Sequence, residues 1–212
     1  MNHIPVSDKR TLRKKRRIYD KEYLILFAGR LHPMKGLAFL IRAFHKVLEK
    51  LPNCRLLIAG NGDYDTCIHE AKDICSKVSF TGLLDKKDLY ELYQMVDVGV
   101  VPSLYEPFGY VAVEMMMHGL PIAATATSGL NEVIDETSGI KVPIIEYPDR
   151  VEIDANLLAE KILYILEHPE EAKRLGKNAR IRYLKEYSSE VFRRNMLKFY
   201  QSILSDSEQC PK

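Results

Sequence analysis

"YLILFAGRLHPMKGLAFLIRAFHKVLEKLPNCRLLIAG", residues 23–60, contains a complete strand–helix–strand pattern. Its first and last seven residues are mainly apolar runs of strand length, and each run ends in Ala-Gly. Between the runs, apolar residues recur on one helical face, at Leu37, Leu40, Ile41, Phe44, Val47, Leu48 and Leu51. Apolar strands that alternate with amphipathic helices are typical of a parallel sheet covered on both faces.

The same alternation continues along the rest of the chain. Further strands are predicted at 77–82, 96–103, 121–127 and 139–144. A helical stretch that ends at Cys75 is predicted, with helices at 85–95, about 110–118, 154–167, 170–187 and 189–204. We therefore expect an α/β fold, a Rossmann-like doubly wound parallel sheet with helices on both faces.

Composition narrows the class of protein. The 212 residues are 46% hydrophobic and 28% charged, which is ordinary for a globular domain. No apolar run approaches the ~20 residues that cross a bilayer, and the polar, then basic, start is unlike a signal peptide. The four cysteines contain no Cys-x-x-Cys pair and the six histidines have no zinc spacing. We expect a cytoplasmic protein without a metal site.

A basic run lies near the amino terminus. "KRTLRKKRR", residues 9–17, holds seven of the 31 Lys and Arg residues, and the rest of the chain is net acidic. One interpretation is a solvated, partly helical segment at the domain edge. The other is a peripheral contact with anionic lipid at the inner face of the membrane, or with an acidic partner. No aromatic residues interleave, so we expect no nucleic-acid binding.

Ligands of doubly wound sheets bind beyond the carboxyl ends of the strands, where four junctions carry polar residues. In "GRLHPMKG" (29–36), Arg30 and Lys35 flank a loop that opens a helix. Two cations beside the unpaired N–H groups of a helix suit a diphosphate, although an ordinary turn with solvated charges explains the loop equally well. Gly60 and Gly62 of "GNGDYD" permit a tight turn and close backbone approach.

Two acidic pairs follow. Asp63 and Asp65 match an Asp-x-Asp metal motif by chance, and we expect Asp65 to cap the next helix instead. In "SLYEPFGYVAVE" (103–114), Gly109 marks a helix start, so Glu106 lies in the loop and Glu114 in the second helical turn. Glu114 has apolar neighbours, and burying a carboxylate is costly unless something hydrogen-bonds it. Both glutamates are therefore predicted to bind a ligand.

These residues, in this order, resemble glycosyltransferase family 4, the retaining nucleotide-sugar enzymes of the GT-B fold. The most specific element is Glu-x7-Glu within "EPFGYVAVE", residues 106–114. The "GR…KG" loop and "GLPIAATATSGLNEVI" (119–134) reinforce it. The resemblance implies the carboxy-terminal, donor-binding half of a GT-B enzyme, which takes a UDP-, GDP- or ADP-sugar and needs no metal or other cofactor.

The resemblance also implies roles for single residues. Arg30 and Lys35 would neutralise the diphosphate and, with Glu106, form the catalytic set. Glu114 would hold the ribose hydroxyls and Glu106 a hydroxyl of the transferred sugar. The full predicted donor site is Gly29, Arg30, Lys35, Gly60, Leu83, Glu106, Phe108, Gly109, Tyr110 and Glu114, with Leu83 at the edge of the base.

Family 4 enzymes have a preceding domain that binds the acceptor, a glycan or a lipid-linked glycan. We expect three parts here: a basic arm at 1–20, the nucleotide-sugar domain at 21–188, and a terminal helix at 189–212. That helix has an apolar stripe that would pack on the missing domain or fold onto its own: Phe192, Met196, Phe199 and Ile203. By itself the chain is predicted to bind donor and to turn over slowly or not at all.

One local departure from the family pattern concerns a glycine pair, which is Ser128-Gly129 here, with Gly129 keeping the flexible position. Three other functions stay open. A non-catalytic nucleotide-sugar-binding module would carry the same donor residues. A sugar-nucleotide epimerase of similar fold would lack Glu-x7-Glu. A polyanion-binding interaction protein would depend on the basic arm and not on Arg30 or Glu114.

Overall fold

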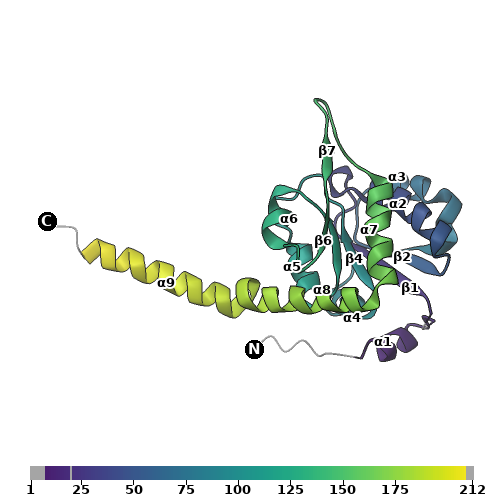
Figure 1. Ribbon diagram of the computed structural model, residues 1–212. Coiled ribbons are helices and arrows are strands. Elements are labelled where there is room, and N and C mark those ends of the chain that lie inside the picture. The colour runs from purple at the N-terminus through teal and green to yellow at the C-terminus, as the bar shows by residue number, and fades with distance from the viewer. Residues whose placement is uncertain (1–7, 20, 209–212) are drawn as a thin grey trace.

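The computed structural model describes residues 8–19 and 21–208, and its centre is a six-stranded parallel sheet (Figure 1). The strand order is β3-β2-β1-β4-β5-β6. The chain therefore adds β2 and β3 on one side of β1 and then crosses over to add β4, β5 and β6 on the other side. The strands are β1 (Tyr23–Ala28), β2 (Cys54–Ala59), β3 (Val78–Gly82), β4 (Val98–Val101), β5 (Ile122–Thr125) and β6 (Ile140–Val142). The predicted fold class is confirmed.

Helices cover both faces of this sheet. One side carries α2 (Leu37–Lys50), α3 (Tyr64–Glu70), the 3-10 segment η2 (Lys72–Lys77) and α7 (Ala155–Glu167). The other carries α1 (Lys9–Lys15), α4 (Lys86–Met95), α5 (Tyr110–Met117) and α6 (Ser128–Val133), while α8 (Pro169–Arg182) packs into the clusters of both sides. A short 3-10 turn η1 (Pro33–Lys35), a π-helical turn η3 (Tyr183–Tyr187) and the long α9 (Ser189–Glu208) complete the helices of the described residues.

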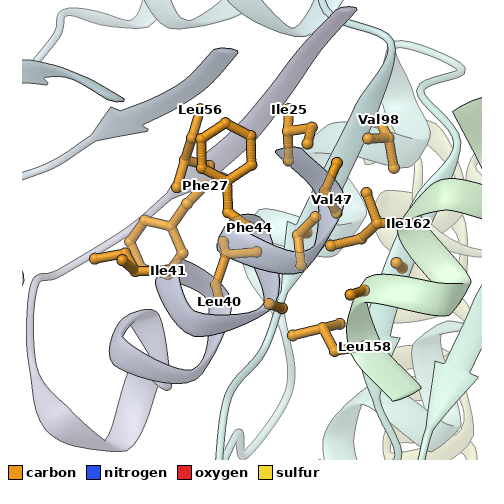
Figure 2. Close-up of a cluster of buried hydrophobic side chains, with 14 of the residues drawn as sticks. Ile25, Phe27, Leu40, Ile41, Phe44, Val47, Leu56, Val98, Leu158 and Ile162 are labelled. Atoms are coloured by element: carbon orange, nitrogen blue, oxygen red, sulfur yellow. The ribbon is translucent and has the colours of Figure 1, made fainter. Parts of the chain in front are cut away.

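Alternation along the strands explains the two layers. Ile25 and Phe27 of β1 point to the α2–α7 side, and Leu24 and Leu26 point to the other side. Figure 2 shows the first cluster, in which side chains of α2 and α7 meet strand residues of β1, β2 and β4. All strand side chains of β4 and β5 are buried, as expected of a sheet covered on both faces.

The basic run forms a helix that packs on the body of the protein. Leu12 and Arg13 of α1 are buried, and Asp8 caps the helix by accepting from the Thr11 N–H. The Arg13 guanidinium donates to Asp97 and to two backbone carbonyls, those of Met95 and Glu22. Other basic residues of this segment pair with acids of α4, so much of its charge is matched inside the molecule.

Two elements project from the body in Figure 1. The first is an antiparallel hairpin of β7 (Ile144–Glu146) and β8 (Val151–Ile153), which the sequence analysis did not predict. The second is α9, whose predicted apolar stripe stays exposed: Phe192 is 67%, Phe199 56% and Ile203 49% accessible. The alternative in which this helix folds onto its own domain is therefore wrong.

No helix among the described residues is long and apolar enough to span a membrane. The first seven residues of the predicted arm, residue 20 at its boundary and residues 209–212 lie outside the described part of the chain. The division into 1–20, 21–188 and 189–212 stays a prediction.

Candidate functional site

A cavity of about 520 Å³ lies at the carboxyl edge of the sheet, where β1, β2 and β3 end. Four predicted donor-site residues line it together: Gly29, Arg30, Gly60 and Leu83. Arg30 and Leu83 are exposed, and the Arg30 guanidinium forms no ion pair with any described residue. Its other lining residues include Asn61, Gly62, Leu84, Leu89, Tyr93 and Val111.

Close backbone contact between two loops forms the floor of this cavity. Gly60 has φ 152°, and a Cβ there would lie 1.8 Å from the carbonyl oxygen of Gly29. Beyond the strands, the Leu31 N–H donates to the Asn61 carbonyl at 2.9 Å, and Leu31 forms a β-bridge with Gly62. These contacts explain why glycine is needed at 60 and fix the backbone that faces the cavity.

The loops after β1 and β4 are also joined, because these strands are neighbours in the sheet. The Leu104 N–H donates to the Met34 carbonyl at 2.9 Å, and a Cβ on Gly36 would lie 1.8 Å from the Pro102 carbonyl oxygen. Lys35 ends the η1 turn, which His32 caps by accepting from the Met34 N–H through Nδ1. This geometry brings Lys35 beside the loop that carries the first glutamate.

Lys35 and Glu106 form an ion pair, with Nζ 2.6 Å from Oε2. The same Oε2 accepts from the Ser103 hydroxyl at 3.3 Å. The Glu106 side chain is 14% exposed and that of Lys35 31%. Both hydrogen bonds fall on one carboxylate oxygen, and among the described residues Oε1 has no partner. Glu106 therefore keeps an acceptor at the carboxyl edge of the sheet.

Glu114 is held in a similar way by a residue that the sequence analysis did not single out. The Tyr93 hydroxyl of α4 donates to Glu114 Oε2 at 3.0 Å, and Oε1 has no partner within the described chain. Tyr93 is 1% exposed and lines the cavity, as does Val111 one helical turn before Glu114. Burial, with the nearby Glu114 charge, raises the pKa of Tyr93, so it remains a donor at neutral pH.

The predicted helix start is confirmed, because Gly109 caps α5 with φ 101° and the helix begins at Tyr110. The first N–H groups of such a helix have no intrahelical acceptor. The Phe108 ring packs on Tyr110, with centroids 4.9 Å apart, and on Tyr187 at 6.1 Å. Six predicted donor-site residues do not line the cavity, and their contacts with a donor stay a prediction: Lys35, Glu106, Phe108, Gly109, Tyr110 and Glu114.

Two local expectations were wrong. Asp63, not Asp65, caps α3, since its Oδ1 accepts from the Thr66 N–H at 3.2 Å. Gly129 lies inside α6, and it has no positive φ. A Cβ on Gly129 would lie 2.4 Å from the Glu106 carbonyl oxygen, and its own N–H donates to that oxygen at 3.1 Å. Close packing against the Glu106 loop, rather than flexibility, explains this glycine.

Tyr93 and Ser103 are the contacts of the two glutamates that the sequence analysis missed. Ser103 begins the quoted segment 103–114, and Tyr93 lies in the helix predicted at 85–95, where it was not singled out. A tyrosine on a buried helical face usually finds a partner for its hydroxyl, and that signal was available in "DLYELYQM". Across the described residues, no group of three or more His, Cys, Asp or Glu side chains could hold a metal ion.

The sequence matches the family described as Glycosyl transferases group 1 over residues 8–182. This chain belongs to that family. A glycosyltransferase of Methanocaldococcus jannaschii, itself uncharacterised, is 42% identical over 143 residues, 64% of this chain and 36% of the relative. The family and the fold that the sequence predicted are confirmed.

Solved structures agree with the family. Sucrose-phosphate synthase of Thermosynechococcus elongatus matches with a TM-score of 0.79 and 30% identity, over 94% of this chain and 51% of that one. An Anabaena protein solved with UDP-glucose matches with a TM-score of 0.79 and 21% identity, over 92% of this chain and 52% of that one.

This chain is much shorter than the archaeal relative and the synthase. The matched segment spans 36% of the archaeal relative and 51% of the synthase. A solved carboxy-terminal domain of a group 1 glycosyl transferase from Francisella tularensis is matched over 95% of its length. That match has a TM-score of 0.75 at 20% identity and covers 87% of this chain. The chain thus has the size and fold of one domain.

Proposed function

We propose that this chain is the donor-binding domain of a retaining glycosyltransferase, which transfers a sugar from a nucleoside-diphosphate sugar to a glycan or lipid-linked acceptor. The proposal rests on the residues found at the carboxyl edge of the sheet. There a cavity with an unpaired arginine lies on the same edge as two glutamates that each keep one free oxygen among the described contacts. The Anabaena neighbour, which was solved with UDP-glucose, supports this class of ligand.

Two cations suit the diphosphate of such a donor. Arg30 has no carboxylate partner in the described chain, so its guanidinium is available for a bidentate phosphate contact. Lys35 uses one of its three N–H donors for Glu106, which leaves two for phosphate oxygens. Charge develops on the diphosphate as the glycosidic bond breaks, and fixed cations stabilise it most in the transition state. Arg30 and Lys35 would thus neutralise the diphosphate charge that a bound metal ion neutralises in metal-dependent enzymes.

The two glutamates suit the sugars at either end of the diphosphate. Carboxylates accept strong hydrogen bonds from hydroxyl groups, and each of these retains Oε1 for that purpose. Glu114 lies one helical turn from Val111 of the cavity wall, and we assign it to the ribose of the nucleoside. Glu106, beside Lys35, we assign to a hydroxyl of the transferred sugar. Leu83, at the cavity rim, is assigned to the base.

We assign acceptor binding to a separate domain, because this chain spans only about half the length of the solved structures that it matches. The exposed stripe of α9 is the surface that we expect to contact it. A cytoplasmic location and a peripheral contact with the membrane stay predictions from the sequence.

Calorimetric titration of this chain with UDP, GDP, ADP and their glucose and mannose conjugates tests the proposal. At least one diphosphate should bind. Arg30→Ala should weaken every diphosphate by about tenfold to a hundredfold, because hydrogen bonds to charged groups contribute about 1.5–3 kcal/mol. Lys35→Ala should act in the same direction. Glu106→Gln should weaken only the sugar conjugates, whereas Glu114→Gln should weaken conjugates and free diphosphates alike.

Arg42→Ala is the matched control, because Arg42 is an exposed cation of α2 that pairs with Glu70 and does not line the cavity. It should leave all affinities unchanged. If no diphosphate binds, or if Arg42→Ala weakens binding as much as Arg30→Ala, the proposed function is wrong. A transfer assay with longer family members cannot replace this test, since it would not isolate the donor domain.

A further inference from the structure

Tyr93 contacts Glu114 of α5 and His118, the residue that caps the carboxyl end of that helix. Its hydroxyl donates to Glu114 at 3.0 Å, and its ring lies 5.4 Å from that of His118, centroid to centroid. The two residues are four positions apart at the end of one helix, so both contacts are made on the same side of it. Tyr90 lies against the same histidine at 4.8 Å. The Glu114 carboxylate is therefore held by Tyr93, a buried residue that is itself packed against its neighbours.

The surroundings leave this contact little freedom. Met115 and Met116, next to Glu114 in the helix, are fully buried, so α5 cannot rotate about its axis without disrupting the core. Tyr93 itself is 1% exposed and lines the cavity with Gly29 and Arg30. The hydroxyl hydrogen bond is thus the contact that determines which oxygen of Glu114 is left for a ligand.

We infer that Tyr93 is a positioning residue for donor binding. By donating to Oε2, it holds the Glu114 carboxylate with Oε1 available to the 2′ and 3′ hydroxyls of the nucleoside ribose. This inference rests on the proposed function, in which Glu114 binds the ribose. Tyr93 itself makes no contact with the ribose hydroxyls; it acts through Glu114, and its removal should cost affinity only where those hydroxyls are present.

The test compares a ribonucleoside diphosphate with its 2′,3′-dideoxy counterpart, using whichever of UDP, GDP or ADP this chain binds best. The wild-type chain should prefer the ribose form. Tyr93→Phe keeps the ring and removes the hydroxyl, and it should weaken the ribose form about tenfold, since a charged acceptor is involved. The affinity for the dideoxy form should not change, so the ratio of the two affinities should fall towards one. Both affinities of each ratio are measured on one protein sample, so partial unfolding would lower both by the same factor and leave the ratio unchanged.

Tyr90→Phe is the control, since Tyr90 is on the same helix, contacts the same histidine, and makes no hydrogen bond to Glu114. Its ratio should stay that of wild type. Equal weakening of both ligands by Tyr93→Phe would show a purely structural role and overturn the inference, while the proposed function would stand. In a Glu114→Gln chain, Tyr93→Phe should change the ratio no further. If the wild-type chain binds no diphosphate, both proposals are wrong.

Discussion

The two edges of the parallel sheet are stabilised by different kinds of interaction. At the amino edge, Asp97 uses both carboxylate oxygens: Oδ1 accepts from Lys9, and Oδ2 accepts from Arg13 and the Leu24 N–H. At the carboxyl edge, Glu106 and Glu114 each have one oxygen bonded and one without a described partner. The loops of that edge are held by backbone contact at glycines.

The difference distinguishes Asp97, whose two oxygens are both bonded within the protein, from the two glutamates that we propose bind the donor. A carboxylate with every oxygen bonded to its own protein has no acceptor left for a ligand and contributes to the fold. A carboxylate anchored through one oxygen has a fixed direction and an acceptor to offer, the arrangement that favours binding. Backbone packing at the carboxyl edge leaves side chains there free for ligands. Three stability predictions test this contrast, and the largest effect is expected where backbone is packed against backbone.

Gly60→Ala should lower the free energy of unfolding by about 4 kcal/mol or more, because the new Cβ would lie 1.8 Å from the Gly29 carbonyl oxygen. Urea unfolding measures the loss. Gly82→Ala is the control: Gly82 also has a positive φ, 73°, but a Cβ added there would have nothing within 4 Å. That change should cost only about 1 kcal/mol. Similar losses for the two variants would contradict the packing explanation.

Asp97→Ala should cost about 3 kcal/mol, because it leaves the buried Arg13 guanidinium without its carboxylate. Chemical denaturation at moderate salt measures the change. Glu91→Ala, which breaks ion pairs of Lys15 and Arg16 on the surface of the same helix pair, should have a much smaller effect that fades as salt rises. Asp97→Ala should leave donor affinity unchanged. A loss of donor affinity in the folded variant would mean that the amino edge also influences binding at the carboxyl edge.

A smaller effect is expected from pH at His118, which lines a pocket at the amino edge with Val96 and Asp97. Burial and the nearby Arg180 charge lower the pKa of His118 to about 4, from 6.5 in an unfolded chain. Below pH 6.5 the unfolded chain gains a proton that the folded chain does not take up until about pH 4. The free energy of unfolding should therefore fall by about 1–2 kcal/mol between about pH 7.5 and about pH 5.0.

Urea unfolding at those two pH values measures this effect. His118→Gln removes the titrating ring and should flatten the dependence over the same interval. Tyr90 and Tyr93, the other titratable groups against the ring, keep their protons because burial raises both pKa values. An unchanged pH dependence in His118→Gln would place the responsible group elsewhere.

Much of the fold could be predicted because each strand and helix has a strong local pattern. The run 23–29 is apolar throughout, and the apolar face of 36–51 has a helical period, so β1 and α2 follow directly. The β7–β8 hairpin was missed because its strands have only three residues each, although Pro148-Asp149 between them is a turn signal. The switch to a π-helical turn after Arg182 likewise leaves no trace in the sequence pattern.

For the site, the sequence indicated which residues lie at the strand ends but not how they pair. Arg30, Gly60 and Leu83 do line one cavity. The Lys35–Glu106 ion pair could not be read from the sequence, because it depends on β1 and β4 being neighbours. Tyr93 was missed for the same reason, since its contact with Glu114 joins two helices across the surface of the sheet.

The position of β4 beside β1 has a consequence for how the chain assembles. Lys35 and Glu106 are separated by 71 positions, so a growing polypeptide cannot form this ion pair until the loop after β4 has been added. If the proposed nucleotide sugar binds there, its presence during refolding would select only species in which that long-range pairing already exists. The ligand should therefore lower the rate of unfolding without raising the rate of the initial collapse of the chain.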